Sequence, residues 1–345
     1  MKHLDDSRLK KLMQKSLSDR KVTDEAILHV TESLIQTSMR GVDSHGINLF
    51  PHYCRAVDAG RVVRNPEIKI NKTAESSAVI DAGHAFGHHV GALAIDLAVE
   101  LASKTGIAAI GVKNSSHFGA AAYFALRAAT KGYIGFSFTN ADALVKAHSS
   151  KDPFFGTNPI CFAAPLANES PFCLDMATSL VSWNKINNYR RMNQPIPAHW
   201  AFDKEGKPVI DPHLAKSLSP IGEYKGFGLG MMVDVLCAVL FGGLISKDLL
   251  AMYTSPIEAQ RKIGHFFMAI NISKFNSLDA FTRDLQSMVD RIRSLRKSDE
   301  SQELMVAGDP EKNCVKEREV SGIPMDEIKF EEFLSLSPDF KTALK

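Results

Sequence analysis

Two histidines of this 345-residue sequence lie in short polar segments bounded by glycine. His45 lies in the segment Ser-His-Gly at 44–46, between two predicted helices, and His117 lies at 115–119, where a predicted strand is followed by a helix. An imidazole titrates near neutral pH, so a histidine exposed at such a junction suits proton donation or removal. A single histidine of this kind more often caps a helix or binds a buried carbonyl. Two of them together give proton transfer equal weight with that structural role.

Three further segments carry donors that suit a phosphate or a carboxamide group. The turn 156–159 and the segment 175–179 place Asn and Thr side chains and backbone N–H groups beside predicted strands. Lys225 stands at the start of an apolar helix, where a cation and a helix N-terminus favour an anion. Taken alone, each segment is also typical of an ordinary turn or helix cap.

Standard nucleotide, metal and hydrolase motifs are missing from the sequence. It has no G-x-x-x-x-G-K-[ST] loop, and the glycine cluster 226–230 follows an irregular segment instead of a strand, which favours helix packing over a Rossmann turn. His84, His88 and His89 have no cysteine or carboxylate at a fixed spacing, so we expect solvent-facing histidines in a loop and no metal site. A hydrolase that uses His117 with a neighbouring serine lacks the G-x-S-x-G signature.

An alternation of strands and helices must position these polar segments. Apolar residues at spacings of three and four, alanine-rich stretches and short β-branched runs predict the elements. The order of strand, polar loop, helix and strand is that of an α/β fold, in which loops at strand ends carry the chemistry. The predicted helices are 5–37 with a break at 18–21, 51–59, 91–103, 120–130, 226–241, 278–295 and 330–336; the predicted strands are 68–72, 78–80, 107–112, 134–139, 159–164 and 265–272; the segments after Trp183 and at 299–320 are predicted to be irregular.

Composition limits the classes of protein that this sequence can represent. Hydrophobic residues make up 45% of the chain, which allows a large core, and the length predicts two domains or one elaborated domain. Lys and Arg number 41 against 39 Asp and Glu, so the net charge of +2 argues against a nucleic-acid or membrane-surface protein. The five cysteines form no C-x-x-C pair, which predicts free thiols in a reducing compartment.

The chain is expected to be a soluble cytoplasmic protein. Residues 1–21 are rich in charge and lack the apolar core of a signal peptide. The most hydrophobic stretch, 230–245, contains Asp234 and several glycines and is too short to cross a bilayer, so we expect a buried helix there.

Five ordered segments together resemble one enzyme family. The segments 40–46 (RGVDSHG), 116–119 (SHFG), 155–159 (FGTNP), 174–178 (LDMAT) and 224–228 (YKGFG) resemble the malate/L-lactate dehydrogenase family that includes ureidoglycolate dehydrogenase and diketogulonate reductase. This family is distinct from the Rossmann-type lactate and malate dehydrogenases. The resemblance extends to about Glu311. It implies an NAD- or NADP-dependent oxidoreductase, homodimeric, that acts on a small 2-hydroxy acid or its 2-oxo or imino counterpart.

The resemblance also implies a fold. The class is α/β (α+β), with a largely antiparallel, non-Rossmann nucleotide-binding sheet and a discontinuous helical domain from both termini. We therefore expect residues 1–70 plus 275–345 to form the helical domain, on the substrate side and with the dimer contacts. Residues 71–274 are expected to form the central nucleotide-binding domain.

The site residues follow from the resemblance position by position. His45 matches the histidine proposed as general acid/base, and His117 matches a second active-site histidine that is the proton acceptor in some members. Residues 307–311 resemble a late P-G-E-type cofactor segment, with alanine in place of proline. The substrate-binding residues implied are Arg40, Ser44, Tyr53, Asn140 and Asp142, and the cofactor-binding residues are Ser116, Phe118, Gly119, Thr157, Asp175, Met176, Ala177, Thr178, Ser179, Lys225, Gly226, Gly308, Asp309 and Glu311.

Two departures from the family pattern concern the substrate. Leu49 stands where many members carry an arginine, and residues 140–142 (NAD) replace a commoner Asn-Ser-Pro-like stretch. If the family arginine holds the substrate carboxylate, the substrate differs here or another cation substitutes, the candidates being Arg40, Lys146, His148 and Arg190. The alternatives are a member that binds nucleotide without 2-hydroxy-acid turnover, or an imine/2-oxo acid reductase. The choice between NAD and NADP stays open.

Overall fold

A seven-stranded sheet forms the centre of the computed structural model, which describes residues 2–147 and 149–344. The strand order is β2-β3-β4-β12-β5-β8-β9, and each neighbouring pair is antiparallel except β3 and β4. The prediction of a largely antiparallel, non-Rossmann sheet is therefore confirmed. The strands are β2 (Lys69–Ala74), β3 (Ser77–Asp81), β4 (Ile107–Ser115), β5 (Tyr133–Thr139), β8 (Ile160–Ala164), β9 (Phe172–Met176) and β12 (Ile263–Asn271).

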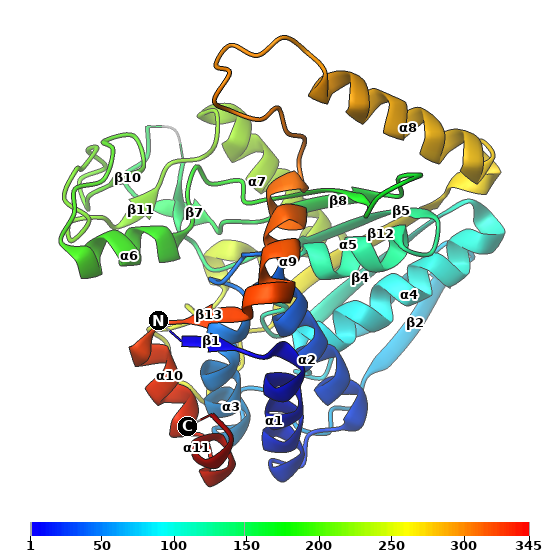
Figure 1. The fold of residues 1–345 in the computed structure, drawn as a ribbon. Helices are drawn as coiled ribbons and strands as arrows, with labels where there is room; N and C mark the ends of the chain where they lie inside the picture. The colour runs from blue at the N-terminus through cyan, green and yellow to red at the C-terminus, as the bar shows by residue number, and fades with distance from the viewer. Residues whose placement is uncertain (1, 148, 345) are drawn as a thin grey trace.

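Alanine-rich helices cover one face of this sheet. Helices α4 (Gly87–Thr105) and α5 (Ala122–Ala129) pack on it through small side chains, and the resulting core contains Ile110, Phe124 and Phe267 (Figure 1). The packing is close, since a Cβ added at Gly135 of β5 would lie 2.5 Å from the carbonyl oxygen of Ala125. Small residues thus let α5 lie directly on the strands.

The other face carries α7 (Tyr224–Cys237) and the short helix η2 (Val239–Phe241). Val233 and Cys237 pack on Phe138 and Phe266 of the sheet. The prediction of a buried helix is right for this side only, because Met231 and other apolar residues on the opposite side are exposed. By length and hydropathy alone, Tyr224–Phe241 would be long enough to cross a membrane, which is weak support for a span because core helices meet the same criterion.

The two ends of the chain share a second hydrophobic core. It combines α1 (Asp6–Asp19), α2 (Asp24–Met39) and α3 (Phe50–Asp58) with α10 (Glu327–Leu334) and α11 (Pro338–Leu344) (Figure 1). Strand β1 (Lys2–Leu4) pairs antiparallel with β13 (Ile323–Met325). Helix α8 (Leu278–Arg293) lies apart from this group and is tied to the β8–β9 connection through Glu169. The domain boundaries at 70/71 and 274/275 stay a prediction.

A four-stranded sheet of order β10-β11-β6-β7 stands beside α6 (Trp183–Met192), where the sequence predicted an irregular segment. That prediction was wrong because the helix contains several asparagines, which have low helix propensity. The Ser182 side chain caps its first turn and Ile186 is buried, and these contacts stabilise the helix. The strands are β6 (Val145–Lys146), β7 (Pro153–Phe155), β10 (Ala201–Phe202) and β11 (Ser217–Leu218).

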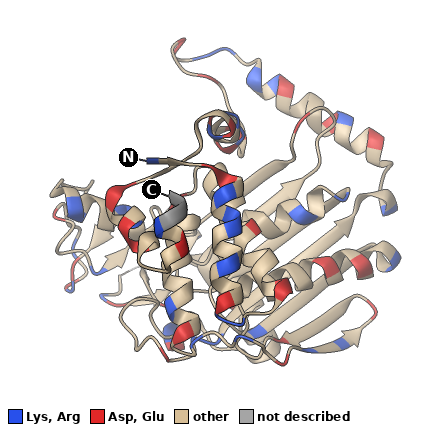
Figure 2. Ribbon diagram, turned by 60° about the horizontal axis from the view of Figure 1, so that its bottom comes forward, with Lys and Arg blue, Asp and Glu red and all other residues tan. Residues whose placement is uncertain are grey.

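Two further expectations are corrected. Helix α9 (Asp309–Ser321) occupies much of the predicted irregular segment 299–320, and its first turn carries Pro310 and two acidic residues, which favour a helix start. His88 and His89 lie in the first turn of α4 instead of a loop, and His88 is fully buried. Basic and acidic residues are interspersed along the helices (Figure 2).

Candidate active site

The loop between α2 and α3 holds His45 in place. A Cβ added at Gly46 would lie 2.1 Å from the Ser38 Oγ, so this position requires glycine for the loop to rest on α2. The Asp43 carboxylate pairs with Arg318 of α9 at 2.5 and 2.8 Å. The Ser44 hydroxyl lies 2.8 Å from His45 Nδ1. Contacts to α2 and to α9 therefore hold the loop that carries the histidine.

His117 follows β4 and lies next to His45, although 71 residues separate them in the chain. The ring centroids of the two histidines are 5.8 Å apart. The hydroxyl of Tyr53, from α3, lies 2.6 Å from His117 Nδ1. Three residues that the family resemblance assigned to one site are thus brought together by three different elements.

Burial sets the protonation of these groups. It lowers the pKa of His45, and it lowers the pKa of His117 well below its usual value, where the charges of His45 and Arg261 act in the same direction. Burial also raises the pKa of Tyr53 well above its usual value. At neutral pH both imidazoles are therefore uncharged, and the Tyr53 hydroxyl keeps its proton.

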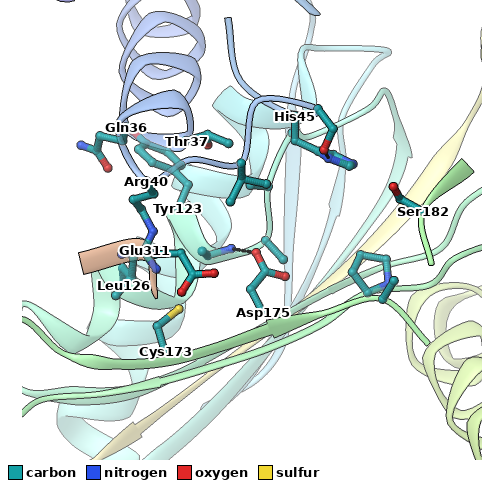
Figure 3. A pocket seen from close by; sticks show the side chains of 18 of the residues that line it. Gln36, Thr37, Arg40, His45, Tyr123, Leu126, Cys173, Asp175, Ser182 and Glu311 are labelled. Carbon is teal, nitrogen blue, oxygen red and sulfur yellow. Dashed lines mark hydrogen bonds between the residues drawn. The ribbon is translucent and has the colours of Figure 1, made fainter. Parts of the chain in front are cut away.

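A cavity of about 230 Å³ opens beside His45. In Figure 3, Arg40 and Glu311 lie toward one end, His45 and Ser182 toward the other, and Asp175 between them. The small residues 119–122 at the start of α5 line one wall and leave room for a ligand. The remaining lining residues are Gln36, Thr37, Val42, Ser44, Tyr123, Leu126, Thr157, Pro159, Cys173 and Ala177.

The Asp175 side chain lies in the wall of this cavity and is accessible to solvent. It accepts a hydrogen bond of 2.8 Å from the backbone N–H of Ala122 (Figure 3). Partial desolvation by the surrounding protein raises its pKa to about 6, against the opposing effects of the Ala122 hydrogen bond and the positive charge of Arg40. A carboxylate at this place suits the hydroxyl groups of a ribose.

The turn before β8 and the end of β9 support each other. The Thr178 backbone N–H and hydroxyl both donate to the carbonyl oxygen of Thr157, at 2.8 and 3.1 Å. The Asn158 side chain, fully buried, donates to the carbonyl oxygen of Gly230 in α7. The polar segments singled out in the sequence at 156–159 and 175–179 are therefore neighbours in space.

Comparison with known proteins agrees with this architecture. The sequence model for malate/L-lactate dehydrogenase matches residues 4–333. The chain belongs to the malate/L-lactate dehydrogenase family. It is 37% identical over 306 residues to a malate dehydrogenase of Pyrococcus abyssi, covering 86% of this chain and 83% of that protein. It is 32% identical over 287 residues to an NAD(+)-dependent ureidoglycolate dehydrogenase of Escherichia coli, and the match covers 83% of this chain and 82% of that protein.

Solved structures of the family share the whole fold. The structure of a malate dehydrogenase from Entamoeba histolytica superimposes with a TM-score of 0.92 at 28% identity, covering 99% of this chain and 98% of that chain. The named relatives include NAD(+)-dependent and NADP(+)-dependent enzymes.

In this family member, some of the predicted site residues lie away from the cavity. Phe118 is buried in the sheet core, stacked on His265 with ring centroids 4.7 Å apart. Ser116 binds the backbone of residues 85 and 87. The predicted cofactor residues that are not in the cavity wall are Ser116, Phe118, Met176, Thr178, Ser179, Lys225, Gly226, Gly308 and Asp309. Their cofactor roles stay predictions.

The predicted substrate residues Asn140 and Asp142 lie at the end of β5. The Asn140 side chain accepts from the backbone N–H of Gly264 at 2.9 Å and donates to the Leu244 carbonyl oxygen at 2.8 Å. Asp142 forms an ion pair with Arg261. Sequence reasoning missed Arg261 and Arg318, since neither lies in a distinctive motif.

The position of the family arginine is apolar here. Leu49 is buried in the core shared by the two chain ends. Among the proposed substitutes, Arg40 lines the cavity, whereas Arg190 donates to the carbonyl oxygens of Pro212 and Ala215 and Lys146 donates to that of Ser150. His148 lies outside the described residues.

Proposed function

We propose that this protein transfers a hydride between a nicotinamide cofactor and a small 2-hydroxy acid or its 2-oxo counterpart, with His45 as general acid/base. The observation that carries the proposal is the pair of histidines, 5.8 Å apart at the ring centroids, with His45 in the wall of a cavity that also contains Thr157 and Asp175. Relatives named as malate, sulfolactate and ureidoglycolate dehydrogenases support this class of substrate.

The chemistry of the cavity suits a dinucleotide. Asp175 offers a carboxylate for ribose hydroxyls, Arg40 offers a cation for a phosphate, and residues 119–122 leave space along the wall. When bound, the nicotinamide supplies or accepts the hydride. We assign NAD or NADP without choosing between them.

The protein's own part in the reaction is proton transfer and orientation. The Ser44 hydroxyl holds His45 through Nδ1, so Nε2 is the nitrogen that we assign to the substrate oxygen. A protonated imidazole there neutralises the alkoxide formed when the carbonyl is reduced. In the oxidative direction the neutral imidazole removes the hydroxyl proton. The Tyr53 hydroxyl orients His117 through a hydrogen bond with Nδ1 of the His117 ring.

A substrate panel tests this function. Purified protein is mixed with NADH or NADPH and a set of 2-oxo acids, including dicarboxylic, sulfonated and imino compounds, and the nicotinamide absorbance is followed. We expect at least one 2-oxo acid to be reduced. The proposal is overturned when no compound is turned over and neither cofactor binds.

A second candidate function is nucleotide binding without 2-hydroxy-acid turnover. The observation that favours it is the buried, apolar Leu49 at the position of the family arginine. In the same panel, this candidate predicts cofactor binding with no turnover of any compound. Turnover limited to the imino compounds would instead identify an imine reductase.

We also propose a homodimer that buries the outer side of α7. Met231 and Val235 of α7 and Val239 and Leu240 of η2 are 55%, 42%, 62% and 61% exposed, and exposed apolar residues gathered on two successive helices are typical of an interface. The free thiols of all five cysteines support a reducing, cytoplasmic location for the assembly.

The expected oligomer is testable by light scattering during size exclusion. The wild type is expected to elute as a dimer, and Val239→Asp combined with Leu240→Asp as a monomer, because two buried carboxylates without partners oppose association. Ile328→Asp, on the exposed side of α10, serves as the control and is expected to leave the dimer intact. A monomeric wild type, or a dimeric double variant, would contradict this interface.

A further inference from the structure

The three central strands of the sheet end at the same edge as the two active-site histidines. In the antiparallel register of β12 with β4, Ile263 pairs with Ser115. Arg261 precedes Ile263 by two residues and His117 follows Ser115 by two residues, so both lie just beyond the same edge of the sheet. On its other side β12 pairs with β5, with His265 opposite Thr139. The chain leaving β5 then reaches Asp142, which forms the ion pair with Arg261.

Arg261 is a buried cation whose guanidinium is held along one edge. Its side chain is 3% exposed, and Nε donates to the carbonyl oxygen of Leu250 at 2.8 Å while Nη2 donates to Asp142. These two bonds use the Nε–Nη2 edge. The Nη1–Nη2 edge has the geometry for a second, bidentate contact with a carboxylate.

The charge of Arg261 acts on the active-site pair. Its positive charge adds to the larger effect of burial in lowering the pKa of His117, whereas for Tyr53 it opposes the larger effect of burial, which raises that pKa. His117 is not bonded to Arg261; its Nδ1 is occupied by the Tyr53 hydroxyl at 2.6 Å. With both residues just beyond the same sheet edge, we infer that the guanidinium can serve a small molecule that also contacts His117.

We propose that Arg261 binds the carboxylate of the 2-oxo or 2-hydroxy acid and that Asp142 is its positioning residue. This inference rests on the proposed function and names the group that selects an acidic substrate. In a 2-oxo acid the carboxylate is bonded directly to the carbonyl carbon. A carboxylate held by Arg261 at this edge of the sheet therefore brings the adjacent carbonyl oxygen toward the imidazoles.

Paired substrates separate this role from a structural one. The reduction of a 2-oxo acid accepted by the wild type is compared with that of its neutral methyl ester. For Arg261→Gln, we expect the KM for the acid to rise about 100-fold, the KM for the ester to change less than about threefold, and the cofactor Kd to stay unchanged. Equal losses for acid and ester would overturn the proposal.

Milder variants keep the test decisive if Arg261→Gln fails to fold. Arg261→Lys keeps the charge but loses the bidentate geometry, and Asp142→Asn removes the partner that orients the guanidinium. Each is expected to raise the KM for the acid about tenfold with the ester unaffected. Arg61→Lys is the matched control, since Arg61 is also buried but donates to the carbonyl oxygens of Met252, Ser255 and Pro256. It is expected to affect acid and ester equally.

A binding measurement separates failure of this inference from failure of the proposed function. Oxamate, an unreactive carboxylate, is titrated calorimetrically into the cofactor-loaded full-length protein. Loss of oxamate binding in Arg261→Gln supports the carboxylate site even where the wild type turns over no 2-oxo acid. Unchanged oxamate binding in that variant contradicts it, whatever the wild type catalyses.

Discussion

Replacing His45 by alanine is expected to reduce the turnover number by about 10²–10⁴-fold, the range typical of a positioned general acid/base. The cofactor Kd is expected to stay within about twofold, because the cavity wall around Thr157 and Asp175 does not depend on the imidazole. Steady-state kinetics and a fluorescence titration with NADH or NADPH give the two values. Turnover near the wild-type level would remove His45 from the mechanism.

Two further variants complement His45→Ala: one removes the hydroxyl that contacts the His45 ring, and the other removes the second histidine. Ser44→Ala removes the 2.8 Å contact to His45 and leaves the ring, so we expect a smaller loss than in His45→Ala. His117→Ala distinguishes the two histidines: if it abolishes turnover while His45→Ala does not, His117 is the general acid/base.

The pH profile is a further readout for His45. Its pKa is lowered by burial, so the neutral base is present throughout the range above about pH 6.5, the ordinary value for histidine. The rate of alcohol oxidation should therefore be independent of this group above that pH and fall only in more acidic solution. In the reductive direction kcat/KM should fall as the pH rises, because the protonated form becomes scarce.

Acidification from pH 6.5 toward pH 4 is expected to destabilise the fold steeply. Burial lowers the pKa of His88 to about 3 and that of His265 to about 3, and both side chains are fully buried. In the unfolded chain both titrate near pH 6.5, so between the two pKa values the unfolded state binds more protons. Their stabilising effect is complete above pH 6.5 and is lost as the pH falls. Each contributes a slope of about 1.4 kcal/mol per pH unit.

The surroundings of these histidines explain why they resist protonation. His265 lies between the hydroxyls of Thr139 and Ser115, at 2.7 and 2.8 Å. Neither ring nitrogen of His88 has a hydrogen-bonding partner among residues 2–147 and 149–344. A proton on either ring would place a charge in an apolar core without an acidic partner.

Urea unfolding at pH 7, 6 and 5 measures the effect. For the two histidines together, the free energy of unfolding should fall by about 4 kcal/mol between pH 7 and pH 5, against a typical total of about 5–15 kcal/mol. Glutamine at position 88 cannot be protonated in this pH range. In His88→Gln, the dependence of the unfolding free energy on pH should therefore be weaker by the contribution of one histidine. An unchanged slope in that variant would show that His88 is not responsible.

Local patterns predicted the elements whose periodicity is strong. The helix pair α1–α2, the strands β4, β5 and β12, and helix α8 all follow from the spacing of apolar residues. Helices α6 and α9 were missed because asparagines and charged residues dominate them and tertiary contacts stabilise them. The placement of β12 between β4 and β5 joins strands far apart in the chain, and no local pattern contains that register.

In the candidate site too, the sequence predicted residues in local motifs but not residues placed by strand pairing. His45 and His117 were recognised by their glycine-bounded loops, which the backbone needs in order to turn. Arg261 was not recognised, because it lies in no distinctive motif and comes to the same sheet edge as His117 only once β4, β12 and β5 have paired. The sequence alone therefore could not indicate Arg261 as the cation that we propose for the substrate carboxylate.

The core shared by the two chain ends has a consequence for biosynthesis. His45 and Tyr53 lie on or beside α3, and Phe50 of that helix packs on Phe333 and Phe340, which the ribosome adds long afterwards. Strand β1 likewise has no partner until β13 has emerged. The segment that carries His45 therefore lacks these packing partners until residues 323–340 have been synthesised. The geometry of the candidate site thus depends on a late-synthesised part of the chain.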